Sequence, residues 1–281
     1  MKSLKTILLL AIATVSVLPA MADIEITNKP ANGAFAIATL QNAAAVYVSS
    51  SEAVVVKKVA NMFAEDINRV TGHKPALSIS KNVKGNRVIV MGTLGSNPFI
   101  DKLAKQGKLD VKNIRGGWEQ YTIQVVKNPT KGVSEALVIV GSDKRGTAYG
   151  ALTISEKMGV SPFYWWTDVP VNHRNEVWLS GKEVSKTPSV KYRGFFINDE
   201  DWGLKTWASH TFEKELGDIG PKTYAKVCEL ILRLKGNMLG PAMHECTGAF
   251  YSHPESKLVA DSLGIMITTS HCEPLLINTA S

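Results

Sequence analysis

Short apolar runs alternate with helical stretches in the last third of the sequence, and this alternation limits the fold more than any other feature. The apolar runs occupy residues 192–197, 237–243 and 265–269. Apolar side chains at helical spacing fill the two intervals between them, at 221–235 and 256–263, and a glycine follows each interval. Repeated strand–helix units of this kind predict parallel strands joined by crossover helices.

These units are too few to close a barrel. A complete (β/α)8 barrel takes roughly 250 residues, whereas about ninety residues follow Val190. Three parallel strands with two helices would leave an unpaired edge and an uncovered face. The chain is therefore expected to be the N-terminal part of a longer protein.

The region from Ala45 to Val160 predicts a small α/β domain with a mixed sheet and two or more helices. Strands are expected at 45–48, 87–91, 121–125 and 136–140, of which 121–125 is predicted to be half-exposed because its polar and apolar residues alternate. One helix is expected from Ala53 to Val70, before Thr71 and Gly72. A second helix is expected after GSDKRG, running to about Gly159; Asp143, Lys144 and Arg145 would cap it and face the neighbouring domain.

Aromatic residues and prolines gather in VSPFYWWTDVPV, residues 160–171, which is interpreted as a packed linker. Residues 172–188 are polar, with short strands. The predicted organisation is an N-terminal α/β domain with an aromatic linker over 23–188, followed by a parallel α/β domain that begins at 189 and is incomplete at 281.

Residues 1–22 have the pattern of a secretory signal peptide. Lys2 and Lys5 precede an apolar run that is too short to span a bilayer, and Ala20-Met21-Ala22 provides a cleavage site. The leader predicts a secreted or periplasmic protein, and no later segment predicts a membrane span.

Composition restricts the partners weakly. The net charge is +7, with no dense block of Lys or Arg, so nucleic-acid binding finds no support, whereas an acidic polysaccharide would suit the surface. Three cysteines, Cys228, Cys246 and Cys272, do not make a disulfide framework. Cys228 is expected on the buried face of a helix.

Polar residues follow all three predicted parallel strands. They are Asn198 and Asp199 after the first, His244, Glu245 and Cys246 after the second, and His271, Cys272 and Glu273 after the third. Ligands of parallel barrels and doubly wound sheets bind at these carboxyl ends. The repetition predicts a site.

Each residue also has a structural interpretation. Asp199 or Asp201 could cap a turn, and Glu200 is expected to point away because neighbours alternate in direction. The histidines could lie at the edge of a core, and Trp202 and Trp207 could pack beneath the loop instead of forming a sugar platform.

Metal and thiol chemistry fit the pattern less well than carboxylate chemistry. His and Cys ligate zinc, but the spacing contains neither CxxC nor HExxH, so no metal is predicted. A Cys–His nucleophile is disfavoured because the two residue types neighbour one another in sequence. Asp199, Glu245 and Glu273 instead supply carboxylates of the kind that glycoside hydrolysis needs, one acid and one base.

The motifs RGFFINDEDWGLKTWA, GDIGPKTYAKVCELILRLKGNMLGPAMHECTGAFY and GIMITTSHCEPLLINTAS closely resemble the barrel opening of glycoside hydrolase family 115. GSDKRGTAYGALTISEKMGVSPFYWWTDVPV resembles the N-terminal domain of that family, so the resemblance covers nearly all of the chain from about residue 40. It implies a small N-terminal α/β domain followed by the first three βα units of an incomplete TIM (β/α)8 barrel.

The resemblance further implies an inverting, exo-acting α-glucuronidase without metal or organic cofactor, which removes glucuronic acid or its 4-O-methyl form from xylan side chains. It places Asn198, Asp199, His244, Glu245, His271 and Glu273 around the uronic acid, with Asp199 as a catalytic candidate. The family's catalytic acid would lie on a later strand, beyond Ser281, so this chain alone is expected to be inactive.

Several alternatives stay open at this point. A family 67 glucuronidase, a family 20 hexosaminidase or a non-catalytic carbohydrate-binding protein would share the architecture. Gly240 departs from the family pattern, which favours a tryptophan in this strand, and would alter one wall of the pocket. Lys144, Arg145 and the histidines are possible partners for the uronate carboxylate. A homodimer of the longer protein would use regions beyond 281.

Overall fold

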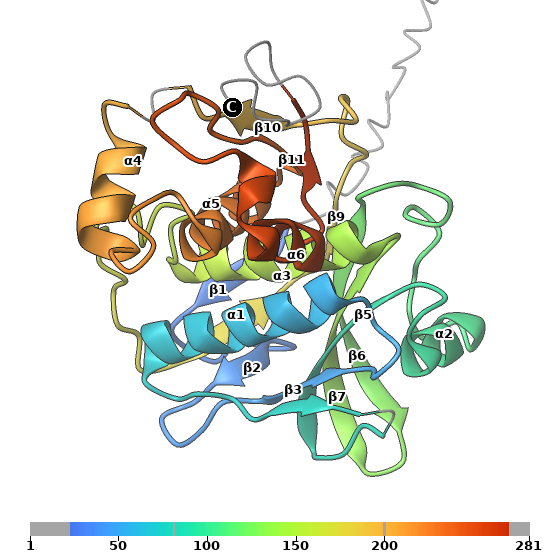
Figure 1. The fold of residues 1–281 in the computed structure, drawn as a ribbon. Coiled ribbons are helices and arrows are strands. Elements are labelled where there is room, and N and C mark those ends of the chain that lie inside the picture. The colour runs from blue at the N-terminus through green and yellow to red at the C-terminus, as the bar shows by residue number, and fades with distance from the viewer. Residues whose placement is uncertain (1–22, 81, 199–200, 270–281) are drawn as a thin grey trace, which may run out of the picture.

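The computed structural model describes residues 23–80, 82–198 and 201–269, arranged as stacked layers of sheet and helix (Figure 1). The elements of the first two thirds are β1 Glu25–Thr27, β2 Phe35–Ala38, β3 Ala45–Val48, α1 Val54–Thr71, β4 Leu77–Ile79, β5 Arg87–Thr93, α2 Pro98–Lys105, β6 Tyr121–Thr130, β7 Val133–Gly141, α3 Lys144–Met158, β8 Val177–Ser180 and β9 Glu183–Val184. Those of the last third are β10 Gly194–Phe196, α4 Leu204–Trp207, a π-helical turn Ala208–Phe212, α5 Pro221–Arg233, β11 Met238–Gly240, a 3-10 turn Phe250–Ser252, α6 Pro254–Ser262 and β12 Met266–Ile267. None of the described helices is long and apolar enough to cross a membrane.

A six-stranded sheet forms the first core, in the order β4-β3-β5-β7-β6-β9. The first four strands pair in parallel, while β6 and β9 pair antiparallel. Because strand side chains alternate between faces, Ile89 and Met91 face α1 and α3, whereas Val88 and Val90 face α2. The predicted mixed α/β architecture with several helices is confirmed.

The helix ends follow the sequence signals. Gly72 and Gly159 end α1 and α3 in the left-handed conformation, with φ of 73° and 107°, which glycine adopts without steric cost. The Asp143 carboxylate accepts hydrogen bonds from the backbone amides of Arg145 and Gly146, at 3.0 and 2.8 Å, so the predicted cap of the second helix is confirmed.

The prediction that residues 121–125 are half-exposed is wrong. Four of the five residues are buried. The segment before β6 covers the polar face of the strand, because the Gln124 side chain hydrogen-bonds the backbone of Asp110 through both its oxygen and its nitrogen. The Thr122 hydroxyl donates to the Glu183 carbonyl at 2.9 Å, so β9 covers this face as well.

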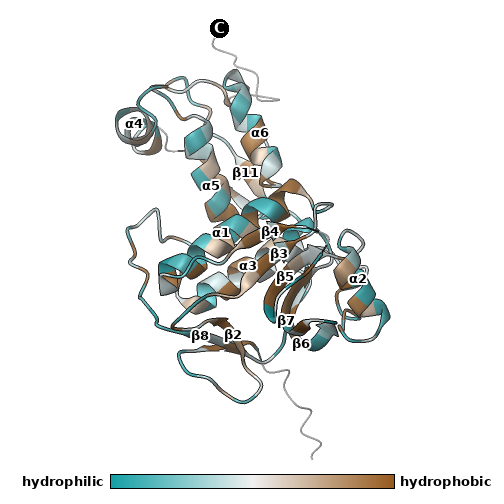
Figure 2. Ribbon diagram, turned by 90° about the horizontal axis from the view of Figure 1, so that it is seen from below, coloured by the Kyte–Doolittle hydropathy of each residue, from teal (hydrophilic) through white to brown (hydrophobic). Residues whose placement is uncertain are grey.

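A second, antiparallel sheet has the order β1-β8-β2. Its central strand β8 comes from the polar stretch that the sequence predicts to contain short strands. This sheet contacts α1 and α3. Viewed from below and coloured by hydropathy, α1 and α5 carry hydrophilic and hydrophobic residues side by side, as amphipathic helices do (Figure 2).

The third sheet, β10-β11-β12, is parallel throughout, with α5 connecting its first two strands and α6 its last two. The predicted parallel strand–helix repeat is therefore confirmed, although the strands are shorter than the apolar runs. Helices α5 and α6 lie between this sheet and the α1–α3 layer (Figure 1), and one buried apolar cluster runs through all of them. Cys228 lies in this cluster, fully buried on α5 as predicted.

A buried ion cluster joins α5 to α1. Arg233 binds both carboxylate oxygens of Asp66, at 2.9 and 3.1 Å, and its Nε donates to Glu229 at 3.0 Å. Burial would lower the pKa of Arg233, but the two carboxylates raise it. Burial would likewise raise the pKa of Glu229, yet Arg233 and Lys226 hold it below its ordinary value. Arg233 and Glu229 therefore stay charged in the interior, and the hydrogen bonds from Arg233 to Asp66 fix the two helices together.

A second polar joint holds the start of β10 against the first domain. The buried Glu119 carboxylate accepts hydrogen bonds from Arg145, Arg193 and Asn237. Asn237 also accepts a hydrogen bond from the Arg193 amide at 2.9 Å, which links β10 to the residue before β11. The position of the small sheet is therefore set by the first domain.

Candidate functional site at the strand ends

Parallel register brings the carboxyl ends of the three short strands to one edge. Phe196 pairs with Gly240, and Leu239 pairs with Ile267. The residues that follow β10, β11 and β12 therefore leave the sheet on the same side. This is the edge at which the sequence predicts a site.

Three polar side chains meet at this edge. The Cys246 thiol donates to Oδ1 of Asp201, and Nδ1 of His244 lies 3.5 Å from the same oxygen. Asp201 follows β10 whereas His244 and Cys246 follow β11, so this cluster joins two strand ends. Its members are solvent-accessible, with 35% of the His244 side chain and 47% of the Asp201 side chain exposed. A carboxylate in this place can accept a hydrogen bond from the imidazole and so orient its ring.

The loop that carries His244 is held from below by Asp218. One carboxylate oxygen of Asp218 accepts from the Gly248 amide at 2.9 Å and pairs with Nε2 of His253 at 2.8 Å. Within the loop, the Thr247 amide and hydroxyl both donate to the His244 carbonyl, at 3.0 and 3.1 Å. These bonds fix the backbone on which the imidazole is mounted.

Helix α5 begins with a cap that the sequence does not reveal. Pro221 occupies the first turn, as predicted, but the capping group is Glu213, eight positions earlier in the chain. Its buried carboxylate accepts from the amides of Gly220, Lys222 and Thr223 and from the Thr223 hydroxyl, over 2.8–3.2 Å. Negative charge at a helix N-terminus is stabilising.

The predicted site residues fall into two groups. Asn198 and Glu245 are exposed at the ends of β10 and β11, and His244 lies in the cluster with Asp201. Asp199, His271 and Glu273 lie outside the described residues, as does Glu200. The structure therefore brings together the ends of the first two strands. It adds Asp201, for which the sequence offered a turn-capping role, and Cys246, which the sequence did not place at the sugar.

The Arg145 guanidinium is bound by two groups of the protein. Its Nη1 pairs with Glu119 at 3.2 Å and its Nε donates to the Gly264 carbonyl at 2.8 Å. These contacts give Arg145 a structural role, and its binding of a uronate stays a prediction. That it faces the neighbouring strand–helix region is confirmed, since Gly264 lies in the connection from α6 to β12.

Gly240 accommodates a neighbouring aromatic ring. A Cβ at this position would lie 2.9 Å from Cδ2 of Phe196. A tryptophan here would require Phe196 to move, so the departure from the family pattern at Gly240 is matched by the place of Phe196. Within the described residues, no group of three or more His, Cys, Asp and Glu side chains is arranged to hold a metal ion.

Comparisons with known proteins identify the family and the solved structures that this chain resembles. Residues 185–281 match the sequence profile of glycosyl hydrolase family 115. A solved family GH115 4-O-methyl-α-glucuronidase with specificity for decorated arabinogalactans is 38% identical, with a TM-score of 0.74; the match covers 85% of this chain and 30% of that chain. The structure of CpGH84D matches at 11% identity and a TM-score of 0.51, over 90% of this chain and 36% of that one, which is a likeness of fold alone. No curated protein matches the sequence.

Proposed function

We propose, because this chain belongs to glycoside hydrolase family 115, that it forms the N-terminal part of an α-glucuronidase. The observation that carries the proposal is the family match over residues 185–281, the segment that contains all three polar strand ends. The chain spans 30% of the length of the similar glucuronidase, so the activity belongs to a longer protein. In that protein, β10, β11 and β12 would be the first strands of a (β/α)8 barrel.

The reaction would remove α-linked glucuronic acid, or its 4-O-methyl form, from a decorated polysaccharide such as glucuronoxylan. An inverting hydrolase needs one carboxylic acid to protonate the leaving oxygen and a second carboxylate to activate water, with the two groups roughly 6.5–9.5 Å apart. We assign Asp199 to this pair and place the main acid on a later strand. Asn198, Glu245, His271 and Glu273 would surround the sugar.

His244 has a defined task in this scheme. The imidazole lies beside Asp201 at the strand ends, where it would donate a hydrogen bond to the carboxylate of a uronic acid. The bonds from Asp218 to the loop keep this imidazole in place. Residues 1–22 would direct the protein to the periplasm or the medium, where such polysaccharides occur.

Release of uronic acid tests the proposal. The chain as given and the same chain extended by the coding sequence that follows it would be incubated with glucuronoxylan and with glucuronidated arabinogalactan. We expect the extended protein alone to release glucuronic acid. Asp199→Asn in the extended protein should lower kcat by about 10²–10⁴-fold, the usual contribution of a positioned acid or base.

The other outcomes are informative. Release by the 281-residue chain would refute its predicted inactivity. If the extended protein binds the glucuronidated polymers without cleaving them, it is a carbohydrate-binding protein and not a hydrolase. Cleavage of N-acetylhexosaminides instead of glucuronides would favour the family 20 alternative.

A further inference from the structure

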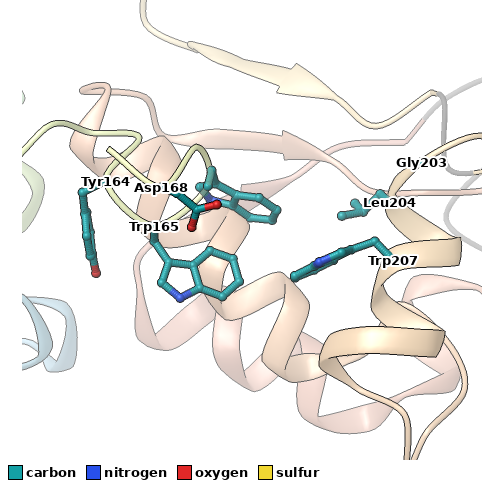
Figure 3. Close-up of a pocket in the computed structure, with 7 residues that line it drawn as sticks. Tyr164, Trp165, Asp168, Gly203, Leu204 and Trp207 are labelled. Carbon is teal, nitrogen blue, oxygen red and sulfur yellow. The ribbon is translucent and has the colours of Figure 1, made fainter. Parts of the chain in front are cut away.

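A cavity lined by aromatic residues lies between the linker and α4 (Figure 3). Its volume is 680 Å³, within the range of ~300–1,000 Å³ that small-molecule sites occupy. The linker contributes four lining residues and the α4 segment three: Tyr164, Trp165, Trp166 and Asp168, then Gly203, Leu204 and Trp207. None of these belongs to the cluster at the strand ends.

Three indoles make the walls of this cavity. Trp165 meets Trp166 edge to face at a centroid distance of 4.9 Å, and meets Trp207 edge to face at 5.7 Å. Figure 3 shows Trp165 and Trp207 on neighbouring walls, one from the linker and one from α4, with the Asp168 carboxylate beside Trp165. Behind Trp207, the ring of Phe212 stacks at 5.0 Å and supports the indole. The aromatic surface is therefore assembled from segments far apart in the sequence.

The linker wall is fixed by α5. The Tyr164 hydroxyl donates to Glu229 at 3.0 Å, and the Arg233 guanidinium lies 4.8 Å from the centre of its ring. Burial, together with Glu229, raises the pKa of Tyr164 to about 12, so its hydroxyl keeps its proton. The Trp166 indole donates to the Lys226 carbonyl at 3.4 Å. A wall held in this way needs little ordering on binding, which favours affinity.

We propose that this cavity is a second carbohydrate site, which binds neutral sugar units of a glycan. The C–H faces of a pyranose are apolar and pack against an indole, while its hydroxyls need hydrogen-bond acceptors such as the Asp168 carboxylate. The described lining residues include this one carboxylate, and the nearby ammonium of Lys226, beside Trp165, already pairs with Glu229 at 3.1 Å. A uronic acid is therefore disfavoured here by charge, in contrast to the strand ends.

A quaternary ammonium ligand is the main competitor, because aromatic cages also bind such cations. Lys226 argues against it. The Nζ of Lys226 already lies 5.0 Å from the centre of the Trp165 ring, so a second cation at this indole would meet like charge. A neutral ligand meets no such repulsion.

The place of the cavity suggests its use. Gly203 and Trp207 belong to the same connection as Asn198, which begins at the end of β10. A polymer held in the cavity would lie beside the strand ends, so the cavity would bind the neutral backbone while a uronic acid side group enters the other site. This last step rests on the proposed function; the binding of neutral sugar does not.

Titration of the 281-residue chain tests the site. Calorimetry and tryptophan fluorescence would follow the addition of xylotetraose, β-1,6-linked galactotriose, glucuronic acid and tetramethylammonium. We expect one of the two neutral oligosaccharides to bind more tightly than the two charged probes, and the better one identifies the backbone. Trp207→Ala should weaken this binding roughly tenfold, the scale of one lost aromatic stacking contact, and Trp207→Phe should recover part of it.

Two further variants make the test specific. Asp168→Asn should weaken binding of the neutral sugar, since amide oxygens accept less strongly than carboxylates. Trp178→Phe, on β8 and remote from the cavity, should leave the affinity unchanged, which controls for loss of a tryptophan. Circular dichroism checks that each variant is folded.

Clear results would overturn the proposal. The first is an affinity for neutral oligosaccharide that is unchanged in both Trp207→Ala and Asp168→Asn. The second is tighter binding of tetramethylammonium or glucuronic acid, lost in Trp207→Ala. The third is that neither neutral probe binds at millimolar concentration. Because these titrations do not use the extended protein, their failure is distinct from a failure of uronic acid release.

Discussion

The two sheets that bear on function, one of six strands and one of three, differ in how much of each strand is buried. In the first sheet, all residues of Val88–Thr93 and of 135–141 are buried. In the second, Phe195 and Phe196 of β10 are 39% and 38% exposed, and β12 is half-buried. The first sheet is a closed core with helices on both faces, whereas the second presents a strand edge and polar residues to solvent.

The difference in burial indicates that the six-stranded sheet contributes mainly to stability, whereas the three-stranded sheet carries the candidate binding site. Strands buried on both faces contribute apolar area, which dominates the free energy of folding. In the small sheet only the central strand β11 is largely buried, and the sheet is positioned by α5, whose Arg233 reaches Asp66 on α1. The candidate site therefore lies on the three-stranded sheet, whose stability depends on its contacts with the six-stranded-sheet region. The following variants test that dependence.

Breaking the buried ion cluster should have the largest effect. Arg233→Leu leaves the carboxylates of Asp66 and Glu229 in the interior without their cation. We expect the free energy of unfolding to fall by about 3–5 kcal/mol, measured by urea denaturation. Arg69→Leu is the matched control, because Arg69 also pairs with Asp66, at 3.1 Å, from a partly exposed position, and should cost under ~1 kcal/mol. If the two variants lose the same free energy of unfolding, the buried contact from Arg233 to α1 is not what stabilises the small sheet.

Truncating one side chain in each sheet measures the contrast directly. Ile139→Ala, at a fully buried position of β7, should cost about 2–5 kcal/mol. Phe196→Ala, on β10, should cost roughly 1 kcal/mol, although it removes more atoms, because much of the ring is already in water. A loss at Phe196 as large as that at Ile139 would mean that β10 contributes to the core as a buried strand does.

Much of the architecture can be predicted from the sequence, because it depends on local patterns. Apolar periodicity predicts α1 and the buried strands, and Gly72 and Gly159 mark helix ends. Helices α2 and α4 were not predicted, although Asn97 and Pro98 supply the cap and first-turn signals of α2. Eight residues give too short an apolar pattern to stand out.

Less of the candidate site can be predicted from the sequence, because its contacts join residues far apart in the chain. Asp201 meets Cys246 across two strands, and Arg233 meets Asp66 across two domains. No spacing rule encodes such pairs. Local rules favoured a turn cap for Asp201; the parallel register of β10 and β11 is what brings it to His244.

Removing the distant cap of α5 should have an intermediate effect. Glu213→Ala leaves the first-turn amides of α5 without their acceptor, and we expect a loss of about 1–2 kcal/mol. Hydrogen exchange at the amides of Lys222 and Thr223 should accelerate, which tests the cap itself. Glu215→Ala is the control, since Glu215 pairs with Lys222 on the surface; unchanged exchange in the Glu213 variant would refute the assignment.

The smallest effects are expected from two carboxylates at the six-stranded sheet, Glu135 on β7 and Glu52 in the connection from β3 to α1, and they should have opposite signs. Burial raises the pKa of Glu52 above its ordinary value despite the Thr93 amide, and its Oε2 is buried with no hydrogen-bond partner in the described part of the chain. Burial would also raise the pKa of Glu135, but ion pairs with Lys127 and Arg87 hold it below the ordinary value.

A raised pKa means that the folded protein binds the proton more tightly than the unfolded chain, so stability falls as pH rises through the region above ~4.3. Glu52→Gln should therefore stabilise the protein at pH 7, and the gain should fade as the pH falls toward 4. Glu135 has a lowered pKa and contributes stability above ~4.3 that is lost in acid. Glu135→Gln should destabilise the protein at pH 7 by under ~1 kcal/mol and converge on the parent at low pH. Urea denaturation between pH 3 and 8 measures both; effects of the same sign would show that the buried sheet does not distinguish a paired carboxylate from an unpaired one.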